Sequence, residues 1–106
     1  NVNVRHYESL LEAELAALDG RRSIALKHYD ISILLAGRQG FIQDQAMAHQ
    51  KLGEFHLKSA NMQDAEYHVG EAIKLYEEWG AFQKAHHIKV KHEKLLAPPS
   101  EILVAT

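Results

Sequence analysis

The chain has 106 residues and a formal charge of −2 at pH 7 with His neutral, a length that suits one domain with a modest core. This charge argues against a general nucleic-acid-binding protein, because such proteins carry a clear basic excess. The sequence holds no Cys, which excludes disulfides and thiolate metal sites and fits a reducing compartment. No apolar run approaches the roughly 18 residues that a membrane-spanning helix requires, so we expect no membrane partner. Because Asn1 rather than Met begins the sequence, we expect the chain to be a piece of a longer protein.

Apolar residues recur at helical spacing along almost the whole chain, and turn residues interrupt them. The pattern predicts five helices, at residues 5–18, 21–36, 41–59, 62–79 and 81–96. Gly20, Gly40 and Gly80 follow predicted helices, where a left-handed residue is favoured. Asn61, with Asp64 three residues later, predicts the start of the fourth helix. The short connections favour antiparallel neighbours, so we expect an all-α domain over residues 1–96 and a Pro-led tail over residues 97–106.

Residues 46–79 contain the small and apolar residues of a tetratricopeptide helix-turn-helix at matching spacing. These residues are Leu52, Gly53, Ala65, Val69 and Ala72. We expect Gly53 and Ala65 to let two helices approach closely, Leu52 and Val69 to fill the seam between them, and Ala72 to admit the next helix. Residues 25–33 resemble residues 65–73 after a shift of 40 positions, which suggests a second copy. The expected fold is therefore a set of antiparallel helical hairpins of tetratricopeptide type, and a plain four- or five-helix bundle is the alternative.

The fourth predicted helix ends with the only Trp of the chain. Its apolar stripe runs through Ala65, Val69, Ala72, Tyr76 and Trp79. We expect Trp79 to close the end of the core, and Gly80 to let the fifth helix fold back as a cap on the array. The functional alternative is that Trp79 anchors a bound peptide.

Several of these positions also resemble a segment of very large sensor kinases, over about residues 20–96. The matching positions are Gly40-Phe41, Ala46, Ala48, Leu57-Lys58, Tyr76, Trp79-Gly80-Ala81 and Lys84. Such proteins join a serine/threonine-kinase-like domain, an AAA-type ATPase domain and a tetratricopeptide-like region to a GAF domain and a histidine kinase. His56 departs from the pattern, because an aromatic residue is common there. The resemblance implies a cytoplasmic signal-transduction protein in which this region is a helical scaffold between nucleotide-binding and sensor modules.

The chain itself shows no signature of an enzyme. No glycine-rich phosphate loop followed by Lys and Ser or Thr occurs, and the Ser residues and carboxylates lack any catalytic pattern. We therefore expect no catalytic residue and no cofactor. The expected function is that of a non-catalytic protein-protein interaction and scaffold domain of a multidomain signalling kinase.

The first helix of each tetratricopeptide repeat forms most of the inner face of the array, and by this analogy the inner face is the expected partner surface. The residues that would point toward a bound segment are Met47, Gln50, Glu54 and Lys58. A competing surface is the first helix, where Tyr7, Leu10 and Leu11 would pair with a second copy, as in a homo-oligomerisation module.

Charge is segregated by helix, since residues 61–79 sum to −4 and residues 80–96 to +3. We expect neighbouring helices of opposite sign to pair along their edges. In the alternative, the lysines of residues 80–96 form a basic stripe that docks an acidic partner or, weakly, nucleic acid. Those lysines are Lys84, Lys89, Lys91 and Lys94.

The eight His residues are the unusual feature of the composition. His49 and His56 lie seven positions apart, or about 10 Å along a helix, which is too far for one ion, so we expect no metal site. We expect His49, His56 and His92 to be partly buried and the other His to be solvated, although His28 and His68 correspond by repeat and would meet across the stack. His-mediated metal binding or pH sensing is a third hypothesis, since exposed His titrates between pH 5 and 8.

Overall fold

The computed structural model describes residues 4–97, and these residues are helical with short connections. The helices are α1 (Arg5–Leu18), α2 (Arg22–Arg38), α3 (Ile42–Lys58), α4 (Met62–Trp79), α5 (Phe82–Lys91) and the single turn α6 (Glu93–Leu96). No strand occurs among residues 4–97. The predicted all-α class is confirmed, and the bounds of the first four helices agree with the prediction to within two residues. The predicted tail from residue 98 onward lies outside the described residues.

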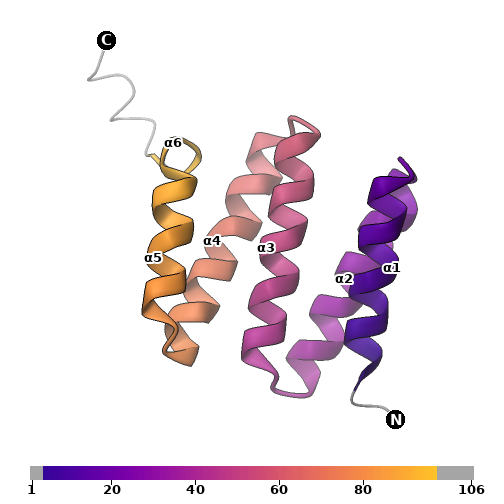
Figure 1. The fold of residues 1–106 in the computed structure, drawn as a ribbon, viewed down its shortest axis with the longest axis horizontal. Coiled ribbons are helices and arrows are strands. Elements are labelled where there is room, and N and C mark those ends of the chain that lie inside the picture. Colours follow the sequence, from indigo (N-terminus) through magenta and orange to yellow (C-terminus); the bar gives the residue numbers. More distant parts are fainter. Residues whose placement is uncertain (1–3, 98–106) are drawn as a thin grey trace.

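The helices form two layers, with α1, α3 and α5 in front of α2 and α4 (Figure 1). Each helix packs mainly against the next one in the chain, so α1 with α2 and α3 with α4 form antiparallel hairpins. α2 packs against α3, and α5 with α6 covers α4, as expected for a capping helix. The molecule is therefore flat, with extents of 53 × 34 × 17 Å. No helix within residues 4–97 has the length and apolar character needed to cross a membrane.

Within residues 4–97, a left-handed residue at every twentieth position follows the end of a helix. These residues are Gly20, Gly40, Ala60 and Gly80, with φ values of 74°, 75°, 59° and 93°. After each of them, the next N–H donates to the carbonyl five residues earlier, at 2.8–3.0 Å. This pattern is a Schellman motif, in which the left-handed residue lets the chain leave the helix while the last carbonyls stay satisfied. The four turns are thus equivalent, and the predicted 40-residue repeat consists of two equal halves.

The helices of the second hairpin approach each other through small residues, as predicted. A Cβ atom on Gly53 would lie 2.8 Å from Val69 Cγ2 and 3.4 Å from the carbonyl oxygen of Ala65. The contact with Val69 Cγ2 is too close for a Cβ atom, and the backbone nitrogen of Val69 would lie only 3.1 Å away. A side chain at this position would therefore push α3 and α4 apart. The prediction that Leu52 fills the same seam as Val69 is wrong, because Leu52 lies on the opposite side of α3 and packs against Ala25 and Tyr29 of α2.

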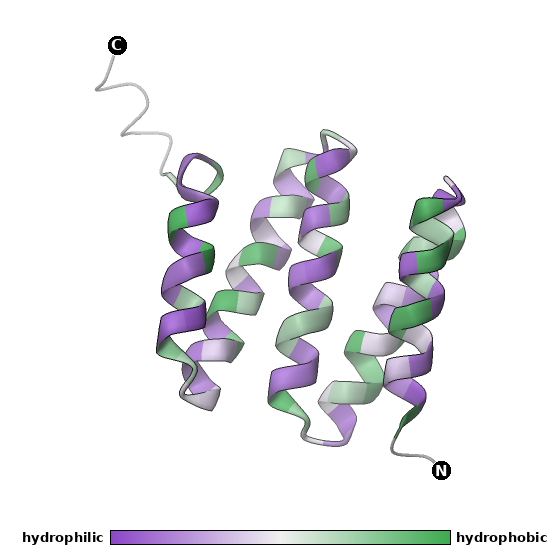
Figure 2. Cartoon of the chain, in the orientation of Figure 1, coloured by the Kyte–Doolittle hydropathy of each residue, from purple (hydrophilic) through white to green (hydrophobic). Residues whose placement is uncertain are grey.

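The core consists of two clusters, one on each side of α3. The first cluster joins α1, α2 and α3 through Ala13, Ala16, Ala25, Tyr29 and Leu52. The second joins α3, α4 and α5 through Ala46, Val69, Ala72, Ile73, Tyr76, Ala85 and Ile88. Coloured by hydropathy, the visible faces of α3 and α5 are largely hydrophilic, whereas α1 shows several hydrophobic residues (Figure 2).

The prediction that Trp79 closes the core is wrong, because 53% of this residue is exposed. The buried residue at this end of the stripe is Tyr76. Trp79 occupies the last position of α4, where Gly80 already turns the chain away, so half of the indole stays in solvent. It borders a shallow hollow of about 230 Å³ beside Tyr7 and Phe41.

The single helix predicted at residues 81–96 is broken at His92, whose φ of −112° is not helical. The break turns Leu95 and Leu96 toward the core cluster of α4 and α5, where both are partly buried. Ala97 is extended, with ψ of 134°, as expected for a residue that precedes Pro98.

Replacing Ala60 by Gly tests the role of the left-handed residue. In the left-handed conformation a residue with a Cβ atom is strained by roughly 1–2 kcal/mol. Gly is not strained there, but it loses roughly 0.5–1 kcal/mol more conformational entropy on folding. We therefore expect Ala60→Gly to raise the free energy of unfolding by about 0.5–1 kcal/mol, measured by urea denaturation.

The matched control is Gly80→Ala, where nothing lies within 4 Å of the added Cβ atom. Since the substitution adds only backbone strain, we expect Gly80→Ala to lower the free energy of unfolding by about 1 kcal/mol. A loss of stability in Ala60→Gly would contradict the equivalence of the four turns.

Candidate partner-binding face

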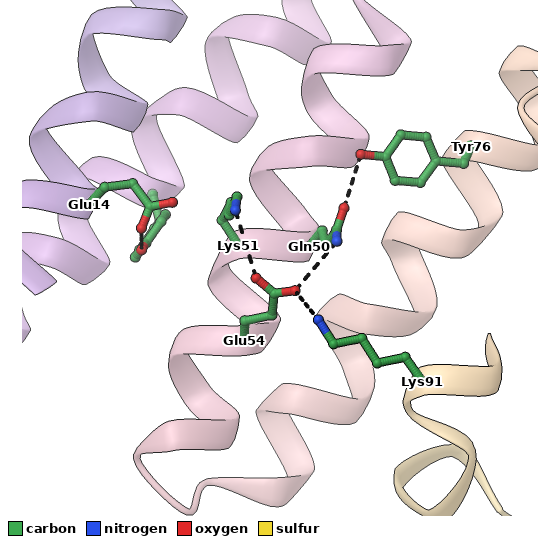
Figure 3. A network of polar contacts seen from close by, with 7 residues as sticks. Glu14, Gln50, Lys51, Glu54, Tyr76 and Lys91 are labelled. Atoms are coloured by element: carbon green, nitrogen blue, oxygen red, sulfur yellow. Dashed lines mark hydrogen bonds and ion pairs between the residues drawn. The ribbon is translucent and has the colours of Figure 1, made fainter. Parts of the chain in front are cut away.

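The front helices present a polar surface, which we call the inner face. Figure 3 shows Glu14 of α1, Gln50, Lys51 and Glu54 of α3, and Lys91 of α5 on this face. Met47 and Lys58 of α3 share it by their helical spacing from Gln50, Lys51 and Glu54. The four residues predicted to meet a partner, Met47, Gln50, Glu54 and Lys58, lie on one side of α3. Met47, Gln50 and Glu54 are half-buried, and Lys58 is exposed.

Glu54 is the centre of a polar network that joins three helices (Figure 3). Its Oε2 atom lies 3.7 Å from Lys91 Nζ and accepts a hydrogen bond of 3.4 Å from Gln50 Nε2. Its Oε1 atom lies 4.0 Å from Lys51 Nζ. Gln50 Oε1 in turn accepts a bond of 3.1 Å from the Tyr76 hydroxyl. Each partly exposed ion pair contributes only about 0–1 kcal/mol, so the network chiefly orders the side chains.

Two buried tyrosines direct their hydroxyls toward the inner face. Tyr76 donates to Gln50, and Tyr29 of α2 donates to Glu14 Oε2 at 2.7 Å. Burial, followed by the nearby Glu54 carboxylate, raises the pKa of Tyr76 to about 12. Burial and then the bond to Glu14 raise the pKa of Tyr29 above its usual range. Both phenols therefore stay protonated and keep donating through neutral and mildly basic pH.

A cavity of about 420 Å³ opens between the C-terminal halves of α1 and α3. The two helices meet at their opposite ends, where Asp44 Oδ2 lies 3.0 Å from His6 Nε2 and accepts a bond of 2.8 Å from Tyr7. That bond raises the pKa of Tyr7. α1 and α3 are thus joined at their N-terminal ends, and the cavity lies between their C-terminal halves.

Most residues of the cavity cannot be predicted from the sequence, because they come from three helices and from the turns that follow α1 and α3. Arg22, Tyr29 and Phe55 line it beside the predicted Glu54 and Lys58. One usable signal existed: Glu14 and Glu54 are 40 residues apart, so they are equivalent positions of the repeat and both line the cavity.

The four lysines of the predicted basic stripe are divided between different neighbours. Lys89 Nζ lies 2.8 Å from Glu77 of α4, which is the expected pairing of oppositely charged helices. Lys91 turns to Glu54, and Lys84 lies 5.3 Å above the Tyr76 ring. Lys94 is exposed.

Three imidazoles stack between α3 and α4. His68 of α4 lies between His49 and His56 of α3, with ring centroids 5.2 and 5.7 Å apart. The Nδ1 atoms of His49 and His68 are 3.0 Å apart, which is a hydrogen bond. His68 thus meets these two residues rather than His28. Within residues 4–97, no group of three or more potential ligands is arranged to hold a metal ion.

The expected burial of His49, His56 and His92 is confirmed, but the expectation for His6 is wrong. His6 is buried because Asp44 binds its ring and Phe41 packs 5.2 Å from it. His28 and His68 are half-buried, and His86 and His87 are exposed.

The His stack resists protonation. Burial, and next His68, lower the pKa of His49 to about 4. Burial lowers the pKa of His56 and His68 as well, and the neighbouring His56 lowers that of His68 further. Asp30 of α2 and Asp64 of α4 act in the opposite direction on both His56 and His68 without reversing the shift.

Stability should therefore fall with acidity below pH 6.5. A depressed pKa means that the unfolded chain takes up a proton which the folded chain refuses, so stability is complete above pH 6.5 and is lost toward pH 4. The expected slope from His49, whose pKa is lowered to about 4, approaches about 1.4 kcal/mol per pH unit. Urea denaturation between pH 7.5 and 5 measures it. We expect His49→Gln to reduce the slope by about one such increment, and exposed His87→Gln to leave it unchanged. Equal slopes in the wild type and His49→Gln would refute the assignment.

Comparisons with other proteins add no relative. No protein-family model, no curated protein and no solved structure matches this chain.

Proposed function

We propose that the chain is a non-catalytic scaffold domain that binds a segment of a partner protein on its inner face. The observation that carries this proposal is the preordered polar network. Glu54 and Gln50 are held by Lys91 and Tyr76, which belong to two other helices. Preordered side chains lose less entropy when a partner binds. The cavity beside them supplies the concave shape that binding sites usually have.

The broader context of this proposal is a multidomain cytoplasmic signalling kinase. Its support is the sequence resemblance, above all the Trp79-Gly80-Ala81 segment after Tyr76. In such a protein the helical domain would pack against neighbouring domains or hold a peptide segment between them, and catalysis would belong to other domains.

Selection from a random peptide library displayed on phage tests the proposal without knowledge of the natural partner. We expect enriched peptides whose dissociation constants rise at least tenfold in Glu54→Lys, because a lysine there repels Lys51 and Lys91 and breaks the network that orders the inner face. The matched control is Lys74→Glu, an exposed reversal on α4 away from the inner face, which should bind as the wild type does. No enriched peptide, or equal loss in both variants, would reject the proposed function.

A second candidate function is self-association, which the exposed apolar residues of α1 favour. Leu11 is 61% and Leu18 84% exposed, and Tyr7 and Leu15 lie on the same side of the helix. Leu10, which was expected to join them, packs partly buried against the core instead.

Light scattering behind size exclusion, over a concentration series at pH 6 and pH 8, tests this candidate. Self-association through α1 should raise the mass above the 12.0 kDa of one chain, and Leu11→Ser with Leu18→Ser should restore it. A single chain at every concentration would remove the candidate.

A further inference from the structure

The cavity between α1 and α3 combines a polar and an apolar wall. Its floor is the ring of Tyr29, which packs 5.7 Å from the ring of Phe55. Leu18 and Ala17 of α1 form the facing wall. An apolar side chain entering between Leu18 and Phe55 would cover the most exposed large apolar residue among residues 4–97.

The carboxylates of the cavity already have partners. Glu14 accepts the hydrogen bond of Tyr29, and Glu54 is shared by Lys91, Lys51 and Gln50. Glu54 is therefore matched by two lysines, whereas Glu14 meets only a neutral hydroxyl and keeps its negative charge.

Two cations of the cavity are available for an anion. Arg22 donates to the neutral Ser59 hydroxyl at 2.7 Å and lies 5.3 Å above the Phe55 ring. Within residues 4–97, neither Arg22 nor Lys58 has a carboxylate within 4.0 Å. Both are exposed and line the same cavity. The cations that line the cavity outnumber the carboxylates, since Arg22, Lys51 and Lys58 stand against Glu14 and Glu54. The net charge is therefore positive, and it lies directly beside the apolar wall.

We propose that this cavity binds an acidic-apolar segment of a partner protein. An apolar side chain of the segment enters between Leu18 and Phe55, and a neighbouring carboxylate pairs with Lys58 and Arg22. The guanidinium suits this role, because its fork binds a carboxylate through two parallel hydrogen bonds. The inference rests on the proposed function and specifies the chemistry of its ligand.

Fluorescence anisotropy with four labelled peptides of about ten residues tests the inference. The first peptide carries Phe flanked by Glu residues, the second replaces these Glu by Lys, the third replaces Phe by Ala, and the fourth replaces Glu by Gln. We expect the first peptide to bind at least tenfold more tightly than each of the others. Because the pairs are exposed, raising the salt should weaken binding.

Variants assign the binding to the cavity. We expect Lys58→Glu and Arg22→Glu each to weaken binding of the acidic peptide at least tenfold, and Leu18→Ser to weaken it severalfold. Lys74→Glu on α4 is the control and should bind unchanged, with circular dichroism confirming that each variant is folded. Equal affinity for the acidic and basic peptides, no binding of the acidic peptide, or insensitivity to Lys58→Glu and Arg22→Glu would overturn the inference.

The library selection separates this outcome from failure of the proposed function. Selected peptides that depend on Glu54 but lack an acidic-apolar pattern would leave the scaffold function standing and reject the cavity ligand. Selected peptides with that pattern, lost in Lys58→Glu, would support both.

Discussion

Close approach of the helices through small residues is the constraint on which the rest of the structure depends. Most of the fully buried apolar residues are alanines, and at Gly53 not even a Cβ atom has room. Helices this close leave no space for large side chains between them. Tyr29, Leu52 and Tyr76 therefore fill the seams where successive hairpins meet. Since large residues at the helix contacts would push the hairpins apart, the small residues set the shape of the array.

The same packing gives the inner face its order. The rings of Tyr29 and Tyr76 are buried in the seams, yet both hydroxyls reach polar residues of the front helices. Tyr29, held by the core, fixes the side chain of Glu14 on α1, and Tyr76 in the same way fixes the side chain of Gln50 on α3. The partner-binding face and the core are consequently coupled, because a change that loosens a tyrosine ring also frees an inner-face residue.

Much of the fold was predictable from the sequence, because Gly20, Gly40 and Gly80 mark the turns and the apolar spacing marks the helices between them. The close approach of α3 and α4 at Gly53 was also predicted correctly, since its spacing along α3 is enough to place it against α4. The burial of Trp79 was predicted wrongly, because periodicity shows which side of a helix faces the core. It does not show at which residue the neighbouring helices stop covering that side. No pattern of residues in the sequence predicts that the helix is interrupted at His92.

The contacts that define the candidate site were harder to predict, since they depend on how the helices are aligned with one another. The repeat predicts which residues of α3 share one side of the helix, because this depends on spacing alone. It does not predict the cavity, because Arg22, Tyr29 and Phe55 converge only once α1 and α3 separate at one end. His68 was assigned to the wrong partner for a similar reason, because repeat equivalence with His28 does not imply contact. His6 was placed in solvent, since nothing near it in the sequence indicates Asp44.

The equal spacing of the turns also bears on how the chain folds. Each helix packs mainly on its sequence neighbour, so the native contacts close short loops and the contact order is low. Such topologies fold fast and without a long search. In arrays of this kind, order spreads between adjacent units. α2, α3 and α4 each pack against a helix on either side, and the most extensive contact is the one between α3 and α4. Opening of the native state should thus begin at α1 or α5 and reach the central hairpin last.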